Sequence, residues 1–415
     1  MKKRIFFTAV LSATIFFAGC YNEVFYDIMQ DVAPEDATVS GNISAITRYT
    51  VSETEYLVVN ADSGLRYKKA LDSGHGNWKT LGGDKLPFDF HSYDYFDAKH
   101  NGEQLIKILA DATTLYLVTV SYKNDDSEGI SAPTVVKLYG AEISDWDAVE
   151  KASWTEIIGE KESSEYFKFA KSDTYYYTTL FGIFQTNAPK KAHRRAYIRA
   201  GNSDAKTKYY KLSGTASPEE TPVKTQDGGS TANSAVWFGG DVLFFNATAS
   251  TTNETYNKDA THFYYASGKT VYHSKAVDSV KYSAETDESF PIEEATLDAD
   301  AAVSALMTCA DALIIGRGDF STSSSTTSSG GLKKTSLDKD GVPGTELIDF
   351  KTNAKTKFNS YHIISLLNAT PDKTEAESDM YTSITFRGTG STSGGSAKNI
   401  GLWSYYPDRG NWNRE

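Results

Sequence analysis

Beyond the first 40 residues, short apolar runs alternate with clusters of glycine, asparagine, aspartate and serine. The runs are rich in tyrosine, phenylalanine, valine, isoleucine and threonine, which are the residues that favour β-strands. Long stretches with the 3.6-residue period of an amphipathic helix are absent from the sequence. The pattern predicts an all-β chain.

One unit recurs along the chain: an apolar strand, a turn, an aromatic-rich second strand, a polar loop and a third strand. The predicted first strands are 43–46, 105–109, 167–169, 235–238, 303–306 and 361–366. The predicted second strands are 56–59, 115–118, 175–177, 242–245, 313–315 and 381–386. Third strands are centred near Leu65, Val136, Tyr197, Val271, Leu332 and Leu402, so five intervals span 337 residues, about 67 each.

A repeat of this kind predicts a β-propeller of six blades over residues 41–415. A radial array of four-stranded sheets buries each sheet face against its neighbours and leaves only short edges. Five to eight blades stay open, because fourth strands are clear only at 78–81 and 153–157. Stacked β-sandwich domains are the alternative fold.

The two ends of the repeat region match each other best. Gly64-Leu65 is followed by Asp72, Gly76 and Trp78, and Gly401-Leu402 by Asp408, Gly410 and Trp412. These residues resemble a degraded Asp-box, the hairpin motif of sialidase-like propellers, although the Asp-to-Trp spacings of six and four differ from the usual five. The resemblance implies structural roles only: the carboxylate accepts turn N–H groups, the glycine permits positive φ and the indole packs between sheets.

The N-terminus has the pattern of an export signal. Lys2, Lys3 and Arg4 precede an apolar stretch, 5–17, that is too short to span a bilayer core of about 30 Å. The stretch ends in Phe17-Ala18-Gly19-Cys20, which resembles a bacterial lipobox of the permissive kind found in spirochaete and related lipoproteins. The resemblance implies a signal peptide over 1–19 and a lipidated tether over 20–40 that begins at Cys20. An ordinary secretory peptide is the alternative.

The lipid on Cys20 would attach the protein to a membrane, because each buried acyl methylene contributes about 0.8 kcal/mol. The expected location is therefore the cell envelope. Tyr21 follows Cys20 in place of the aspartate that signals inner-membrane retention. In a bacterium with two membranes, the lipoprotein rule then implies the outer membrane or the cell surface.

Charge argues against a nucleic-acid partner. The formal net charge is −12, and removing 1–19 with its three basic residues changes it to −15, which repels phosphates. Cys309 is the only cysteine besides Cys20, so no disulfide framework is expected, and its apolar surroundings predict a small buried hydrophobe.

Two segments contain residues that could bind a metal. His91, Asp94, Asp97 and His100 are spaced by three, which fits no single face of a strand, so solvated loop residues are favoured. Asp338-Lys339-Asp340-Gly341 resembles the start of a calcium loop, but the remaining ligands do not follow, and a polar turn is favoured. We therefore expect no metal or other cofactor.

The long polar loops are the expected place for a partner. They comprise 122–133, 185–193, 246–261, 317–330 and 387–398, are mostly rich in serine, threonine, asparagine and glycine, and are predicted to join second to third strands. Loops of that class lie on one face of a propeller, so we expect a protein or glycan partner there.

The tripeptide Arg317-Gly318-Asp319 opens one of these loops and resembles the RGD motif by which some adhesins engage integrins. A surface adhesin is therefore one alternative function, in which the arginine supplies a cation and the aspartate a metal-coordinating carboxylate.

The sequence contains no nucleophile elbow and no HExxH pair, which are motifs that would indicate an enzyme. No catalytic residue is therefore predicted. The main hypothesis is a lipid-anchored propeller that works as a binding or interaction scaffold. A glycan- or peptide-processing hydrolase of sialidase-like architecture is the alternative, and it predicts acids or arginines that converge on the central channel. The candidate arginines are Arg66, Arg194, Arg195, Arg199, Arg317 and Arg387. An envelope assembly subunit, which would expose an apolar patch, is a further possibility.

Overall fold

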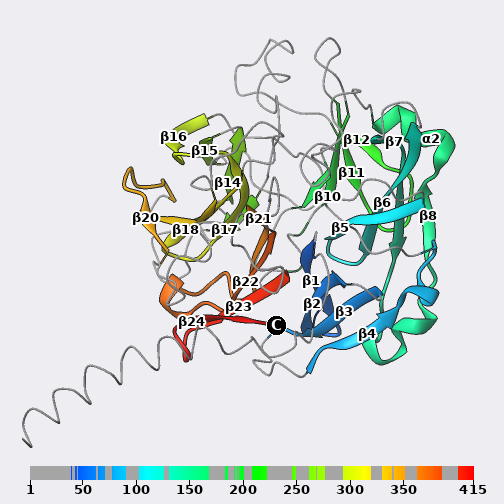
Figure 1. Ribbon diagram of the computed structural model, residues 1–415, viewed down its shortest axis with the longest axis horizontal. Coiled ribbons are helices and arrows are strands. Elements are labelled where there is room, and N and C mark those ends of the chain that lie inside the picture. The colour runs from blue at the N-terminus through cyan, green and yellow to red at the C-terminus, as the bar shows by residue number, and fades with distance from the viewer. Residues whose placement is uncertain are drawn as a thin grey trace, which may run out of the picture. The chain divides into compact units, whose positions relative to one another are not determined.

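In the computed structural model, the alternating apolar runs form strands that pair into four-stranded antiparallel sheets (Figure 1). Residues 38–415 form one compact unit. The structure describes residues 39, 43, 45–61, 64–70, 77–89, 102–125, 130–167, 183–185, 191, 194, 196–200, 208–221, 245–248, 261–267, 269–275, 293–318, 330–338, 341–350, 362–385 and 401–415. The predicted signal peptide and nearly all of the tether lie outside these residues.

Six four-stranded sheets are present in the described residues. The first three consist of β1 (Ile46–Val51), β2 (Thr54–Ala61), β3 (Gly64–Lys69) and β4 (Lys79–Gly82); β5 (Gly102–Ala110), β6 (Leu115–Asp125), β7 (Ile130–Ala141) and β8 (Thr155–Ile158); and β9 (Ile183–Gln185), β10 (Ala196–Ala200), β11 (Lys208–Leu212) and β12 (Glu219–Thr221).

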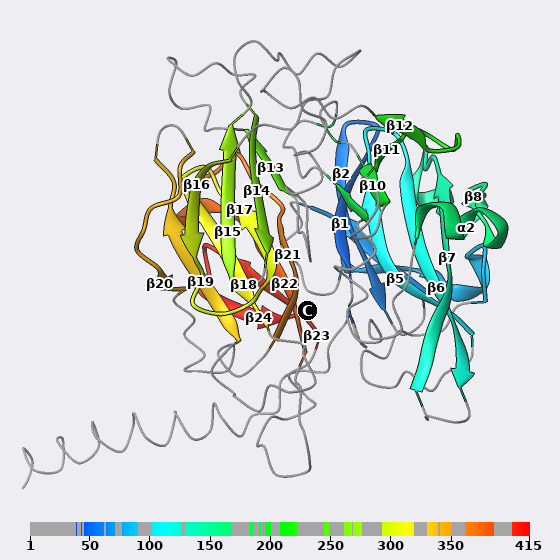
Figure 2. The ribbon, with the colours of Figure 1, turned by 90° about the horizontal axis from the view of Figure 1, so that it is seen from above.

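The last three consist of β13 (Phe245–Thr248), β14 (Thr261–Ser267), β15 (Thr270–Lys275) and β16 (Glu293–Asp298); β17 (Val303–Thr308), β18 (Ala312–Arg317), β19 (Gly331–Ser336) and β20 (Ile348–Asp349); and β21 (His362–Asn368), β22 (Met380–Thr385), β23 (Gly401–Tyr406) and β24 (Asn411–Arg414). Spatial order follows chain order in every sheet, so each is an antiparallel meander (Figure 2).

Helices are few. The described residues contain one α-helix, α2 (Glu160–Tyr166), and the 3₁₀ helices η2 (Gly83–Lys85), η3 (Trp146–Lys151) and η6 (Glu375–Glu377). Helix α2 docks on β7, because the Ser163 hydroxyl accepts the Val136 N–H at 3.0 Å. Within the described ranges, no helix has both the length and the apolar character needed to cross a membrane.

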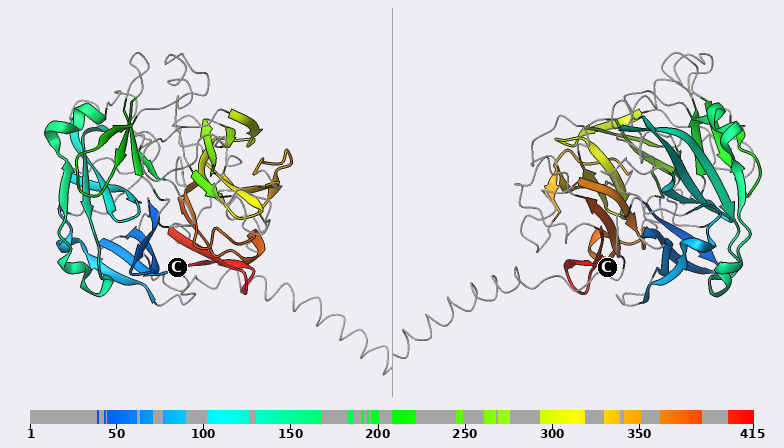
Figure 3. Two further views of the ribbon diagram at one scale, coloured as in Figure 1. Left: turned by 180° about the vertical axis from the view of Figure 1, so that it is seen from behind. Right: turned by 45° about the vertical axis from the view of Figure 1, so that its right-hand side comes forward.

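Within the described part of the chain, five pairs of neighbouring sheets meet through their first strands. β1 contacts β5, β5 contacts β9, β13 contacts β17 and β17 contacts β21. β21 also contacts β1, so the last sheet packs on the first (Figure 3).

Hydrophobic side chains fill the space between these sheets. In β2, Val58 packs toward the second sheet, whereas its neighbours Leu57 and Val59 pack toward the last sheet. This alternation follows from the two-residue period of a strand, which sends adjacent side chains to opposite sheet faces. Comparable clusters join the second sheet to the third, the fourth to the fifth and the fifth to the sixth. Burying each such aliphatic or aromatic side chain contributes roughly 1.5–3 kcal/mol, so the sheet interfaces are the core.

The all-β prediction is confirmed, and the predicted strands overlap the observed ones in the first, second, fifth and sixth units. The first strand of the first unit was predicted at 43–46, but β1 begins only at Ile46 and continues to Val51. The third and fourth units need correction. The first strand of the third sheet is β9, and 197 lies in its second strand, not its third. Residues 242–245 were expected in a second strand, but β13, which begins at Phe245, is the first of its sheet. β9 has only three residues, too few for a two-residue period to identify it.

The expected common loop face is corrected for the same reason. The segments 317–330 and 387–398 do join second to third strands, but most of 122–133 belongs to β6 and β7, which leaves only 126–129 as the connection between them. The segments 185–193 and 246–261 instead lie between the first and second strands of their sheets. Because strand direction alternates within a meander, these two loops leave the opposite end of the sheets. We call that end, which carries the Ser52-Glu53 turn between β1 and β2, the turn end.

Candidate functional site

The turn between β1 and β2 positions a group of polar side chains. Ser52 and Glu53 both have positive φ, 45° and 67°, which forms a tight two-residue hairpin of the kind that matches strand twist. The hairpin register places Thr50 opposite Glu55 and Arg48 opposite Leu57. Positions two apart on a strand share a face, so Arg48, Thr50 and Glu55 lie on one face at the turn end.

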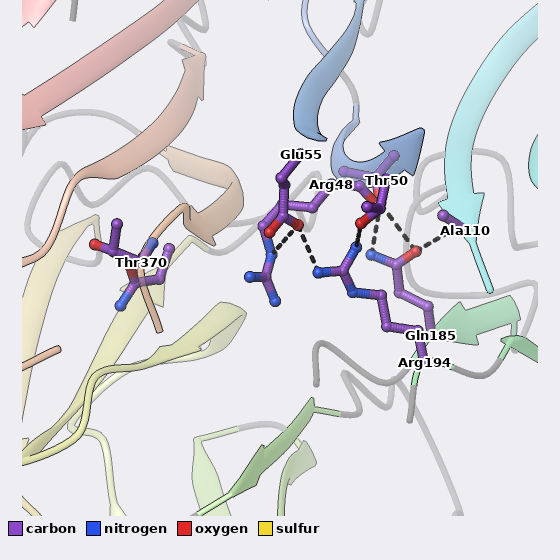
Figure 4. Close-up of polar contacts among 9 residues, drawn as sticks. Arg48, Thr50, Glu55, Ala110, Gln185, Arg194 and Thr370 are labelled. Carbon is purple, nitrogen blue, oxygen red and sulfur yellow. Dashed lines mark hydrogen bonds and ion pairs between the residues drawn. The ribbon is translucent and has the colours of Figure 1, made fainter. Parts of the chain in front are cut away.

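Arg194, from the segment between β9 and β10, reaches this hairpin (Figure 4). Its Nη2 donates to Glu55 Oε1 at 2.5 Å, and its Nη1 donates to the Thr50 hydroxyl at 3.0 Å. The Arg48 Nε lies 3.6 Å from the same Glu55 oxygen. Two guanidinium groups therefore share one carboxylate oxygen.

Both arginines are buried and Glu55 is not. The side chains of Arg48 and Arg194 are 2% and 3% exposed, and that of Glu55 is 24% exposed. Burial, and next the positive charge of Arg194, lower the pKa of Arg48 to about 10, whereas Glu55 and Asp372 act in the opposite direction. Burial also lowers the pKa of Arg194, and Glu55 opposes this shift. Both remain charged at neutral pH, so two cations are held side by side in a poorly solvated place.

Gln185 fixes the third sheet against the first two. Its Oε1 accepts the Ala110 N–H from the end of β5 at 2.7 Å, and its amide exchanges hydrogen bonds of 3.0 and 2.8 Å with the Thr47 hydroxyl of β1. Lys107 of β5 adds a second tie, because its Nζ donates to the Ile183 carbonyl oxygen of β9 at 2.5 Å. The first strands of three sheets thus meet beside the arginine pair.

Thr370, in the segment that follows β21, is drawn on the far side of Arg48 from Arg194 (Figure 4). The Thr370 N–H donates to Asn368 Oδ1 at 2.8 Å, which fixes the backbone of this segment. Asp372, two residues further along the same segment, acts electrostatically on Arg48.

The arrangement suits recognition of an anion. Guanidinium groups donate in a rigid planar fork, which matches carboxylate and phosphate oxygens and gives strong charge-assisted hydrogen bonds. Low solvent exposure strengthens such interactions, since the local dielectric is below that of water. The Thr50 hydroxyl holds one Nη of Arg194 and fixes the orientation of its fork.

The adhesion tripeptide is described in part. Arg317 is the last residue of β18, is 6% exposed, and donates from Nη2 to the Gly330 carbonyl oxygen at 2.7 Å. The Gly318 N–H donates to the Ala302 carbonyl oxygen at 3.0 Å. Asp319 lies outside the described residues, and so does Cys20. The adhesion role and the lipidation stay predictions.

The residues that resemble an Asp-box lie at two sheet interfaces. Trp78 is buried between the first and last sheets, and Trp412 between the fifth and sixth. Gly410 has φ +62° and Asp408 is exposed. Asp72 and Gly76 lie outside the described residues.

The candidate metal residues do not form a site in the described part of the chain. No group of three or more His, Cys, Asp or Glu side chains there could hold a metal ion. The segment 91–100 and Asp340 lie outside it. Asp338 forms a turn, in which its Oδ1 accepts the Val342 N–H at 2.9 Å and Gly341 has φ +69°.

Of the arginines considered from sequence, Arg194 joins the pair. Arg66 of β3 instead binds the Thr80 hydroxyl. Arg317 is the last residue of the second strand β18, so it lies at the end of its sheet opposite the turn end. Arg195, Arg387 and the side chain of Arg199 lie outside the described residues. Arg48, Glu55 and Gln185 were missed. The sequence did contain one indication of this site, because Arg48 is a charged residue within the strand 46–51. The predicted strand 43–46 ended before Arg48, so the residue was not considered.

No protein-family model matches the chain, and no curated protein sequence matches it. Solved structures similar to it include AofleA from Arthrobotrys oligospora, at 10% identity and TM-score 0.42 over 91% of this chain and 86% of that one. The NanB sialidase from Streptococcus pneumoniae aligns at 8% identity and TM-score 0.44, over 90% of this chain and 70% of that one. The GH43_1 enzyme from Xanthomonas citri aligns at 10% identity and TM-score 0.35, over 76% and 93%.

Proposed function

We propose that this chain is a lipid-anchored protein of the cell envelope, folded as a six-bladed β-propeller, that binds an anionic ligand at the Arg48–Arg194 pair. The six meanders support the propeller, as do the contacts of β1 with β5 and of β21 with β1. The N-terminal pattern that ends in Cys20 supports the anchor.

The sharing of Glu55 by Arg48 and Arg194 carries the binding proposal. Burying two like charges is unfavourable, and a chain selected for stability alone would replace one of them by an apolar side chain. Unfavourable local arrangements of this kind concentrate at functional sites. A bound anion would stabilise the two buried arginines, and anion binding would therefore explain why both are present.

Binding fits the geometry better than hydrolysis. Hydrolysis of a glycoside uses two carboxyl groups with separate roles, one of them as proton donor. Glu55 already accepts a charged hydrogen bond from Arg194 on the oxygen that also faces Arg48. Its role is that of a counterion. The hydrolase alternative also predicted converging arginines, so release of a product has to be measured in the same test.

The test is calorimetric titration of the purified chain with glucuronate, and with glucose as the uncharged counterpart. We expect glucuronate to bind and glucose to bind at least about tenfold more weakly. Arg48→Met and Arg194→Met should each weaken glucuronate binding by a similar factor. Arg409→Met, at an exposed turn, is the control and should leave it unchanged.

Equal binding of glucuronate and glucose, or binding that survives both arginine variants, would contradict the proposal. New reducing ends released from an acidic oligosaccharide by the wild type, and not by Arg194→Met, would favour the hydrolase.

A further inference from the structure

One side chain of the arginine cluster is more exposed than the two cations around it. Glu55 is 24% exposed, against 2% and 3% for Arg48 and Arg194. Solvent therefore reaches the Glu55 side chain more readily than either cation that it contacts.

We propose that Glu55 occupies the place of a ligand carboxylate, and that the ligand of this site is a carboxylate that exchanges with it. This inference rests on the proposed function, because it assumes that the arginine pair binds an anion. It adds the chemical class of the ligand and a competitor built into the chain.

The two contacts of Glu55 are unequal. Glu55 Oε1 is 2.5 Å from Arg194 Nη2 and 3.6 Å from Arg48 Nε, so it forms a hydrogen bond with one guanidinium and only a longer ion pair with the other. The position of Glu55 is limited by its backbone, which pairs with Thr50 and accepts the Ala70 N–H at 2.8 Å. A ligand carboxylate is not tied to β2 and can approach both guanidinium groups more closely.

The charges of the cluster also favour replacement of Glu55 by a ligand carboxylate. Glu55 contacts both cations, Asp372 also acts on Arg48, and burial still lowers the pKa of each arginine. A ligand that places one carboxylate in the site neutralises the cations as well as Glu55 does. Glu55 then rotates outward into solvent, which it already contacts, while its backbone stays paired in the hairpin.

The built-in occupant also indicates the class of ligand. A carboxylate is planar and offers two oxygens in the plane of a guanidinium fork, whereas a phosphate is tetrahedral and carries up to two charges. The site already holds a carboxylate, held by one fork nitrogen and backed by the Thr50 hydroxyl on the other. We therefore expect glucuronate to bind better than glucose 6-phosphate.

The decisive variant is Glu55→Gln, which keeps the shape of the side chain and removes its charge. If Glu55 competes with the ligand, this variant should bind glucuronate about tenfold more tightly, because a charged Glu55 carboxylate no longer occupies the site for most of the time. Glu53→Gln removes the same charge from the same hairpin, two residues away and exposed, and should leave affinity unchanged. The thermal midpoint of each variant is measured to show that it is folded.

Glu55→Asp is a second variant, for use if the glutamine variant is unstable. It keeps the charge and withdraws the carboxylate by one methylene, so glucuronate should again bind more tightly than to the wild type. Glucose 6-phosphate is titrated in parallel, and tighter binding of the phosphate than of glucuronate would overturn the ligand class.

The outcomes separate the two proposals. If Arg194→Met abolishes glucuronate binding but Glu55→Gln leaves it equal or weaker, the anion site stands and the exchange is wrong. If glucuronate binds neither the wild type nor Glu55→Gln, both are wrong.

Discussion

Lys68 and Glu415 form a fully buried ion pair, with 3.2 Å between Nζ and Oε2, although they are 347 residues apart in the chain. Lys68 belongs to β3 of the first sheet, and Glu415 follows β24 of the last. The Trp78 Nε1 donates to Glu415 Oε2 at 2.7 Å, and the Tyr406 hydroxyl donates to Oε1 at 2.9 Å. The pair therefore joins the two ends of the repeat region.

The first prediction concerns the stability of this junction. Glu415→Gln leaves the Lys68 charge buried without its carboxylate, so we expect a loss of about 3–5 kcal/mol in the free energy of unfolding. Urea unfolding measures it. Lys269 and Asp298 form an ion pair in which both side chains are about 60% exposed. Asp298→Asn breaks this pair and is the matched control, and it should cause no measurable loss in the free energy of unfolding.

A double variant tests whether the loss comes from the unpaired charge. Lys68→Met with Glu415→Gln should lose less than the sum of the two single losses, because no buried charge is left alone. Additive losses would mean that the two side chains stabilise the junction independently, and would contradict the ion-pair account.

The second prediction is the pH dependence of the same pair. Burial raises the pKa of Glu415, but the Lys68 ammonium, the nearby Ser404 hydroxyl and the hydrogen bonds from Trp78 and Tyr406 outweigh it and hold the pKa below its ordinary value. The stabilisation is thus complete above the unfolded pKa of about 4.3 and is lost as pH falls through the folded value. The stability difference between wild type and Glu415→Gln should narrow below about pH 4, and a constant difference would contradict this assignment.

Sequence predicted the local features of the fold well. The all-β class and the burial of aromatic side chains follow from alternation within single strands, and Trp78 and Trp412 were identified from their hairpins. The Lys68–Glu415 and Glu55–Arg194 pairs were not predicted, because they join residues 347 and 139 positions apart. Such pairs depend on how the sheets pack, and no short-range pattern in the chain encodes it.

The third prediction concerns Lys107, whose Nζ donates to the Ile183 carbonyl oxygen. Burial lowers its pKa to about 8. The amine reacts with acylating reagents only when unprotonated, so acetylation followed by mass spectrometry should be half-maximal near pH 8. Lys85, with a side chain 45% exposed, is the reference for reagent access.

The shift also has a stability consequence. The folded state releases the Lys107 proton at lower pH than the unfolded state, whose lysine pKa is about 10.4. The stability of the wild type relative to Lys107→Met should therefore rise between pH 8 and pH 10. A flat difference over this range, together with half-maximal acetylation near pH 10, would show that the amine is solvated.

The fourth prediction separates adhesion from stability at Arg317-Gly318-Asp319. The Arg317 side chain is 6% exposed and bonded to the Gly330 carbonyl oxygen, so its cation is held within the protein. We expect Arg317→Ala to lower the free energy of unfolding by about 1.5–3 kcal/mol, the usual contribution of a hydrogen bond to a charged group. Asp319→Ala should leave attachment of host cells to the coated protein unchanged, and a loss of attachment in this folded variant would establish the adhesin function.

The fifth prediction tests the anchor, and the two cysteines of the chain provide their own control. Cys309 is 3% exposed, and burial raises the pKa of its thiol to about 12, so it is a poor nucleophile. Cells fed radiolabelled palmitate should label the wild type and Cys309→Ser equally, and Cys20→Ser should carry no label. Mass analysis of the processed wild type should show an N-terminus at Cys20 that carries the added lipid. An unmodified N-terminus at another residue would indicate an ordinary secretory signal, and the protein would then reach its ligand without a membrane attachment.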